Sequence, residues 1–338
     1  MTYTARRRML AGTAAGLLAA SLGVAVSSPA TASTATAAPA RTTASACTIS
    51  TLPYPTDTYR ADASAIDPSG RFVAGTGLRV GETENEYLLL VWDKQRLIEI
   101  VAPGSGLDPV DVNESGTVIA NGWAESGIGR PWTYRDGKLQ QLPVLPSTGI
   151  FVTAINSAGD IVGFGSDIVP GEFSALRWPA ARPGTVEVLD APVNAQATGI
   201  TPNGTIVGQA GPFGDWTGWV RRPNGKVKPL AVAGGGSTVV NAAAGHWAIG
   251  QVWLGGNNPA KVRWDLRNGS HTILDPEAGL DDVNAKGVVV GGALVTRGAT
   301  SRVLPGGGNV GAKAIADTGA IVGFRNADRV TPVRWTGC

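Results

Sequence analysis

The sequence AINSAGDIVG at residues 154–163 is the basis of the expected fold, because related copies of it recur along the chain. With small changes it occurs seven times. The other copies are AIDPSGRFVAG at 65–75, DVNESGTVIANG at 111–122, GITPNGTIVG at 199–208, VNAAAGHWAIG at 240–250, DVNAKGVVVGG at 282–292 and AIADTGAIVG at 314–323. The turn glycines of successive copies lie 46, 43, 45, 41, 42 and 32 residues apart. A regular period of this size indicates a repeat architecture.

Each copy predicts a β-hairpin. A short apolar pair precedes Asn, Asp or Thr, two small or polar residues and a glycine follow, and the copy ends in an apolar run. The Asx side chain bonds its own backbone two residues on, and glycine supplies the positive φ that a tight turn needs. The flanking Val and Ile residues favour strands. We therefore interpret the repeated Asn and Gly residues as structural.

A second signature follows the hairpin, for example SALRW at 174–178 or RDGKLQQLP at 135–143. When the repeats are aligned on their Asp-Gly and Asn-Gly turns, the expected third strand carries a large aromatic residue in six repeats. These residues are Trp92, Tyr134, Trp178, Trp264 and Trp335, with Trp132 and Trp219 two residues earlier on the same face of the strand. Thr296 takes the position in the sixth repeat. We expect the aromatic residues to pack between neighbouring repeats.

Two hairpins per repeat make four strands, and a period of roughly 40–45 residues is that of a propeller blade. We therefore predict an all-β fold over residues 47–338, a seven-bladed β-propeller with four-stranded antiparallel blades. The short spacing before the last copy is explained by loss of a loop in the sixth repeat, at GGALVTRG from Gly291.

Residues 1–32 predict a signal peptide. Arg6–Arg8 precede a run of Ala, Leu, Gly and Val, and Ala30–Ala32 fits a small-residue cleavage site. The arginines also fit a twin-arginine signal, so the export route stays open, and a retained membrane anchor is the alternative to cleavage. Residues 33–46 contain few bulky apolar groups, so we expect a disordered leader.

The charge balance changes when the signal peptide is removed. The chain has 28 Lys and Arg against 26 Asp and Glu. Residues 1–32 contain three arginines and no acidic residue, which leaves 25 basic against 26 acidic residues and a net charge near −1. The sequence has no basic stripe with interleaved aromatic residues, and we expect no nucleic-acid partner.

The two cysteines of the chain, Cys47 and Cys338, bracket the repeats. Aligned on the second repeat, Trp335 takes the place of Tyr134, Ile49 takes the place of Leu139, and both cysteines fall at the hairpin turn. We therefore expect the segment after Cys47 to form the outer strand of the last blade and to close the ring. A Cys47–Cys338 disulfide would replace the missing turn, and export supplies the oxidising compartment.

The expected binding surface is the rim formed by the loops between second and third strands and between blades, because these loops are long and variable. Aromatic faces beside carboxylates and amides on this rim suit sugar rings. The candidate binding residues are Trp123, Phe164, Asp167, Glu172, Asp215, Trp216, Trp253 and Phe324, with Glu125, Phe213, Asn257, Asn258, Asn326 and Asp328 beside them. The alternative is that some rings are inward plugs and the acids are solvated loop residues.

Catalytic patterns are sparse, and we name no catalytic residue. His246 and His271 are the two histidines of the chain, expected at an inner hairpin turn and in an outer strand, away from the loop rim. Ser-His-Asp and Cys-His chemistry are disfavoured, because the cysteines serve closure. No His and Cys spacing predicts a metal site, and we expect no cofactor. Paired rim carboxylates for glycoside chemistry stay open.

The repeats resemble the extracellular HAF repeat family in AINSAGDIVG at 154–163, SALRW at 174–178 and RDGKLQQLP at 135–143. The resemblance covers residues 65–338. The eponymous His-Ala-Phe is replaced by Ser-Ala-Leu at 174–176 and by Arg-Pro-Trp at 130–132. The resemblance implies a secreted β-propeller-like protein and brings no established catalytic residues.

These observations favour a secreted, non-catalytic binding or scaffold propeller. Its expected partner is an extracellular glycan or a cell-surface protein. We expect a monomer that has no membrane contact once the signal peptide is removed. A carbohydrate-active hydrolase or lyase that uses carboxylates of the loop rim is the alternative.

Overall fold

The structure, a computed structural model of the chain, describes residues 47–81, 84–123, 128–212, 214–255, 258–307 and 309–338. All of them belong to the second of two units into which the chain divides, Ala44–Cys338. The predicted signal peptide and leader, residues 1–46, lie outside the described residues. Within the described ranges, no helix is long and apolar enough to cross a membrane.

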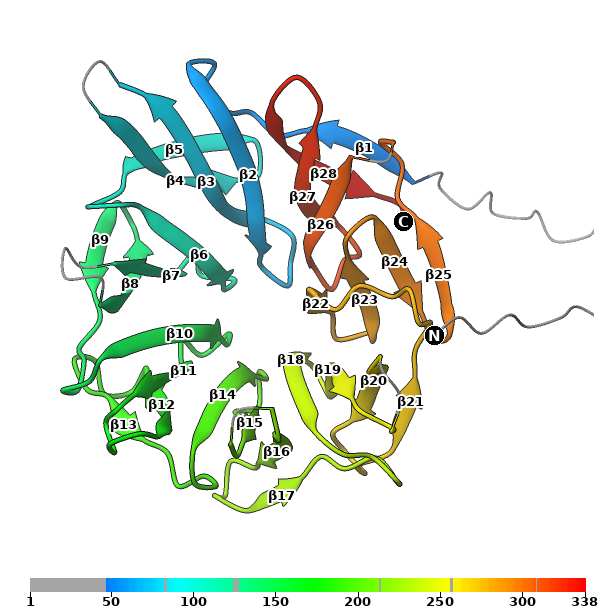
Figure 1. The fold of residues 1–338 in the computed structure, drawn as a ribbon. Coiled ribbons are helices and arrows are strands. Elements are labelled where there is room, and N and C mark those ends of the chain that lie inside the picture. Colours follow the sequence, from blue (N-terminus) through cyan, green and yellow to red (C-terminus); the bar gives the residue numbers. More distant parts are fainter. Residues whose placement is uncertain (1–46, 82–83, 124–127, 213, 256–257, 308) are drawn as a thin grey trace, which may run out of the picture. The chain divides into compact units, whose positions relative to one another are not determined.

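The strands form antiparallel sheets arranged in a ring (Figure 1), and five of these sheets have four strands each. The first sheet consists of β6 (Leu107–Val112), β7 (Val118–Trp123), β8 (Gly129–Arg135) and β9 (Lys138–Gln141). The second consists of β10 (Gly149–Ile155), β11 (Ile161–Ser166), β12 (Phe173–Trp178) and β13 (Glu187–Val188). The third sheet consists of β14 (Ala195–Ile200), β15 (Ile206–Ala210), β16 (Thr217–Arg221) and β17 (Val227–Pro229). The fourth consists of β18 (Thr238–Ala244), β19 (Trp247–Val252), β20 (Ala260–Asp265) and β21 (His271–Ile273). The fifth consists of β22 (Asp282–Val283), β23 (Val288–Gly291), β24 (Leu294–Arg297) and β25 (Thr300–Val303). An all-β propeller with four-stranded antiparallel blades is therefore confirmed.

The sixth sheet has eight strands, so the number of separate sheets differs from the seven that we expected. It consists of β1 (Thr48–Thr51), β2 (Thr58–Ile66), β3 (Phe72–Val80), β4 (Asn85–Asp93), β5 (Arg96–Val101), β26 (Val310–Ile315), β27 (Ile321–Asn326) and β28 (Val330–Thr336). A parallel bridge between Arg60 and Val330 joins β2 to β28. The bridge forms because β2 has nine residues, more than the other strands nearest the centre of the ring, and its early residue Arg60 thereby reaches β28.

The predicted pairing of the N-terminal segment with the last strand is confirmed. β1 pairs antiparallel with β28, and Ile49 lies opposite Trp335 as Leu139 lies opposite Tyr134. Cys47 and Cys338 form the predicted disulfide, with their Cα atoms 4.4 Å apart.

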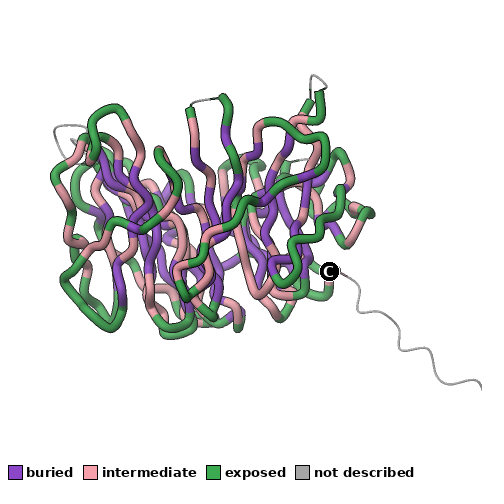
Figure 2. The backbone as a smooth tube through the Cα atoms, turned by 90° about the horizontal axis from the view of Figure 1, so that it is seen from below, coloured by how far each residue is buried: buried purple, intermediate pink, exposed green. Residues whose placement is uncertain are grey.

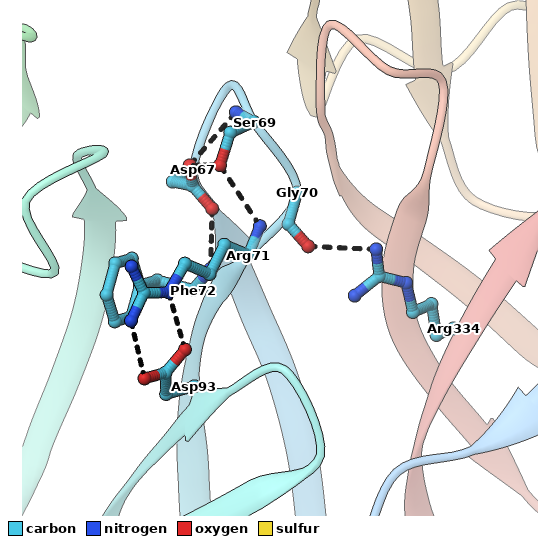
Figure 3. Close-up of polar contacts among 7 residues, drawn as sticks. All are labelled: Asp67, Ser69, Gly70, Arg71, Phe72, Asp93 and Arg334. Carbon is cyan, nitrogen blue, oxygen red and sulfur yellow. Dashed lines mark hydrogen bonds and ion pairs between the residues drawn. The ribbon is translucent and has the colours of Figure 1, made fainter.

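The repeated turns have the predicted structural role. All seven turn glycines have positive φ, between 57° and 90°. The Asp67 carboxylate accepts hydrogen bonds from the backbone N–H groups of Ser69 (2.9 Å) and Phe72 (2.5 Å), as Figure 3 shows. In addition, Gly70 N–H donates to the Asp67 carbonyl (2.8 Å). The Asx side chain and the glycine therefore close the turn together, as turn chemistry requires.

The same turns also join neighbouring repeats, which the turn pattern did not predict. The amide nitrogens of three turn asparagines donate to a backbone carbonyl of the next turn around the ring: Asn113 to Asn156 (3.2 Å), Asn156 to Thr201 (3.4 Å) and Asn284 to Ala316 (3.0 Å). Asp67 has no such donor. Arg334 of β28 joins this turn to the preceding repeat by donating to the Gly70 carbonyl at 2.8 Å (Figure 3), as Arg263 of β20 donates to the Gly287 carbonyl.

The third-strand tryptophans lie between repeats, as predicted, and they make a directional contact there. The indole N–H donates to the carbonyl of a proline after the preceding outer strand: Trp92 to Pro53 (2.6 Å), Trp178 to Pro143 (2.8 Å) and Trp335 to Pro305 (2.7 Å). The apolar clusters span neighbouring repeats, for example Val207 and Val220 with Val262 and Trp264. Figure 2 shows the buried residues along the strands and the exposed residues at the loops of both rims.

Candidate functional site

The predicted loop rim is a continuous edge of the ring in the structure. Strands β7, β11 and β15 end at this edge, and β8, β12 and β16 begin there. The inner strands β10, β14 and β18 also begin at it. Side chains at these strand ends therefore come together although they are far apart in the sequence.

A row of five aromatic rings crosses three neighbouring sheets on this rim. The ring centroids are separated by 5.6 Å for Trp123 and Phe151, 5.5 Å for Phe151 and Phe164, 5.6 Å for Phe164 and Phe173, and 6.3 Å for Phe173 and Trp216. Two of the contacts are edge-to-face, a geometry that aromatic quadrupoles favour. We call these five residues the aromatic row.

The structure brings three of the predicted binding residues, Trp123, Phe164 and Trp216, into the aromatic row. The other two members, Phe151 and Phe173, are residues that the sequence analysis missed. Both lie near the rim end of a strand, in β10 and β12. That position was a usable signal, because strand ends at one rim must gather there.

The row changes from exposed to buried along its length. Trp123 is 46% exposed, whereas Trp216 is 8% exposed. The three phenylalanines between them are partly buried. Trp123 is therefore the most exposed ring of the row, and Phe151 is the member of the row that packs against it.

The predicted rim acids flank this row. Asp167 lies in the turn after β11 with φ 57°, and its carboxylate accepts hydrogen bonds from Thr148 Oγ1 (2.5 Å) and Gly171 N–H (3.0 Å). The Thr148 bond, with the Gly171 bond second, lowers the pKa of Asp167. Glu172 closes the same turn through backbone bonds, and Asp215 is exposed beside Trp216. Asp167 is thus an ionised carboxylate that organises its own loop.

Trp253 and Phe324 lie on the same rim but apart from the row. Trp253 follows β19 and its backbone pairs with Ser237, while Phe324 lies opposite Gly311 in β27. Across the described residues, no ring contact joins either side chain to the aromatic row. The flanking candidates Glu125, Phe213 and Asn257 lie outside the described residues.

Both histidines lie where the sequence placed them. His246 is in the turn between β18 and β19 with its ring 4.5 Å from that of Trp247, and His271 is exposed in β21. Within the described part of the chain, no group of three His, Cys, Asp or Glu side chains could hold a metal ion.

Sheet order and strand pairing therefore place the chain in the class of β-propellers. No protein-family model matches the chain, and no curated protein matches it. Among solved structures, the chain is similar to the β-propeller domain of the Trilobed protease from Pyrococcus furiosus, with a TM-score of 0.57 and 10% identity, over 83% of this chain and 96% of that one.

The chain is also similar to an acylaminoacyl peptidase from Pyrococcus horikoshii, with a TM-score of 0.55 and 12% identity over 83% of this chain. It spans about half the length of that peptidase, 52%. At such low identity these similarities describe the fold and carry no information on activity.

Proposed function

We propose that this protein is a secreted, non-catalytic binding propeller that holds an extracellular glycan on the loop rim. The observation that carries the proposal is the aromatic row, which presents the half-exposed ring of Trp123 on a base of packed rings. A ring that is already held in place loses little conformational freedom when a ligand binds. Sugars offer apolar ring faces for such a side chain, and the flanking Asp167 and Asp215 supply acceptors for their hydroxyl groups.

The proposal includes a closed ring of seven blades. On this view the eight-stranded sheet is two blades, β2–β5 and β26–β28 with β1, joined by the single Arg60–Val330 bridge. Two contacts support the role of the N-terminal segment as the missing outer strand. Trp92 donates to Pro53 as Trp178 donates to Pro143, and Leu52 is 1% exposed with its N–H bonded to the Pro332 carbonyl.

The disulfide supports the extracytoplasmic part of the proposal, since such bonds persist in oxidising compartments. Cleavage after Ala32, secretion, a monomeric state and membership in the HAF repeat family stay predictions from the sequence.

The test is a glycan array probed with the wild-type protein and with two variants. Trp123→Ala removes the exposed ring of the row. Val303→Ala is the control, because Val303 is 74% exposed in the outer strand β25. Trp216→Ala is unsuitable, because Trp216 is buried and its loss would disturb the fold.

We expect wild type and Val303→Ala to bind the same glycans and Trp123→Ala to lose them. Removal of a central aromatic contact costs about 2 kcal/mol or more, which is roughly thirtyfold in affinity. A wild type that binds no glycan, or binding that survives Trp123→Ala, would refute the proposal. Turnover of a bound glycan by the wild type would favour the hydrolase or lyase alternative.

A further inference from the structure

Each strand that faces the centre of the ring carries one extra residue, a β-bulge or its equivalent. The pairing register shifts around Ser64, Val110, Thr153, Thr198, Asn241 and Lys313. The equivalent extra residue of β22 is Asp281, just before the strand. Its N–H donates to the Val290 carbonyl, although Val290 is already the strand partner of Asp282. A bulge redirects a side chain and often lies beside a functional site.

All seven of these residues line one cavity at the centre of the ring, with a volume of about 300 Å³. The repeat thus delivers one side chain from every inner strand to the same space. A cavity of this size holds about ten water molecules at roughly 30 Å³ each. It is at the lower end of the range for ligand pockets, so it suits a small molecule.

The wall of the cavity is polar. Ser64 Oγ donates to the Pro109 carbonyl at 2.9 Å, and Thr153 Oγ1 donates to the Ala197 carbonyl at 3.0 Å, each toward the next inner strand. The hydroxyl of Thr198, the next member of the series, is buried and has no partner among the described residues. The amide of Asn241 adds a further donor and acceptor to the wall.

The charge of the cavity is negative. Its ammonium group, that of Lys313, is already paired with Asp281 at 2.9 Å. Asp111 and Asp282 also line the adjoining cavity on the hairpin-turn side, which Asp281 and Lys313 do not. Their carboxylates accept backbone N–H bonds from Val112 and Ile155, and from Val283 and Ile315.

In the part of the chain that the structure describes, no Lys or Arg side chain forms an ion pair with Asp111 or Asp282, and the Lys313 ammonium in the same cavity pairs with Asp281 instead. Burial is the main cause that raises the pKa of each to about 7, and the nearby charges that act on them are acidic, Glu114 and Asp67 for Asp111, and Asp111 and Asp281 for Asp282. Enclosed carboxylates that form no ion pair are costly, and a bound cation offsets that cost.

We propose that this central cavity binds a small organic cation with a primary ammonium group. The inference goes beyond the glycan site on the rim and does not depend on it. The ammonium donates three hydrogen bonds, and Asp111, Asp282 and Asn241, which line the cavity, offer acceptors. A metal ion is the poorer occupant, since no three metal-ligating side chains converge in the described chain.

The test is isothermal titration calorimetry at about pH 8, above the pKa of both carboxyls. The probes are propylammonium chloride, the uncharged propan-1-ol of similar size, and calcium chloride. The variant Asp111→Asn/Asp282→Asn removes the negative charge of both carboxylates from the cavity. Asp136→Asn is the matched control, because Asp136 is exposed at the outer hairpin of β8 and β9 and its φ of 49° suits asparagine.

We expect propylammonium to bind and propan-1-ol and calcium not to bind. Affinity for propylammonium should fall by about tenfold or more in Asp111→Asn/Asp282→Asn and stay unchanged in Asp136→Asn. If the double variant does not fold, Lys313→Met replaces it. This change removes the competing ammonium from a partly exposed side chain and should tighten binding several-fold.

Equal binding of propylammonium and propan-1-ol, no binding of propylammonium, or preferential binding of calcium would overturn the proposal. So would an affinity for propylammonium that neither the double variant nor Lys313→Met changes.

Discussion

Replacement of two equivalent tryptophans by phenylalanine separates the hydrogen bond between repeats from the packing between them. Trp335 in β28 and Trp264 in β20 occupy the same repeat position, and both are 0% exposed. The indole N–H of Trp335 donates to the Pro305 carbonyl at 2.7 Å. The indole N–H of Trp264 is buried and has no partner among the described residues.

Both substitutions remove the same ring volume, so the packing cost is similar in the two variants. Trp335→Phe also loses a hydrogen bond with a net value of about 1 kcal/mol. Trp264→Phe instead removes an unpaired buried donor, whose burial costs about 1–3 kcal/mol. Trp335→Phe should therefore destabilise the protein by about 2 kcal/mol or more beyond Trp264→Phe.

The measurement is the free energy of unfolding of both variants from urea titrations, compared with wild type. If the slope of the unfolding free energy against urea concentration is the same in both variants, the difference between their urea midpoints gives the difference in stability directly. If Trp264→Phe destabilises the protein as much as Trp335→Phe, the indole bond to the proline carbonyl contributes nothing and the tryptophans act through packing alone.

Three other predictions concern the Cys47–Cys338 disulfide, the carboxyl groups of Asp111 and Asp282 in the central cavity, and the turn asparagines. Cys47→Ser/Cys338→Ser should lower the free energy of unfolding by at most about 5–6 kcal/mol, since the bond closes almost the whole repeat region, and an unchanged melting temperature would show that pairing of β1 with β28 suffices. Burial raises the pKa of Asp111 and Asp282 to about 7, above the unfolded value of about 3.9, so their contribution to stability is full below about pH 4 and is lost as pH rises through 7. Stability should therefore fall across that window more steeply in wild type than in Asp111→Asn/Asp282→Asn, and equal slopes would contradict the raised values. Asn284→Asp keeps the acceptor of the turn but removes the donor to Ala316, so it should cost about 1–3 kcal/mol in thermal or urea unfolding, and a neutral effect would show that this bond is dispensable.

The repeat made much of the fold predictable. Asx-Gly turns are local chemistry, so the hairpins at Gly70 and Gly159 followed from the residues themselves. The pairing of Ile49 with Trp335 followed from alignment to Leu139 and Tyr134, because equivalent repeats pair in the same register. These features depend on short stretches of sequence that recur.

The central cavity was not predictable in the same way. An extra residue such as Thr153 becomes a bulge only in relation to the partner strand, and alternation within one strand does not show it. The bridge from Arg60 to Val330 depends on how far β2 extends past its neighbours, which the repeat does not specify. Both features arise from the packing of the ring.

The candidate rim site was partly predictable. Trp123, Phe164 and Trp216 were recognised as loop aromatics, but their order in a row and the burial of Trp216 were not. Phe151 and Phe173 were missed because they belong to strands and not to loops, and an aromatic residue of a strand is normally part of the core. Trp253 and Phe324 share the rim without joining the row, since they belong to other sheets.

Hydrogen–deuterium exchange of the protein with and without a glycan selected on the array tests the rim site most directly. Bound glycan should protect the backbone around the aromatic row, at residues 149–152, 164–174 and 215–217, and leave the hairpin turns at 67–70 and 156–159 unchanged. Protection at those hairpin turns, or none at the aromatic row, would contradict the placement of the binding surface.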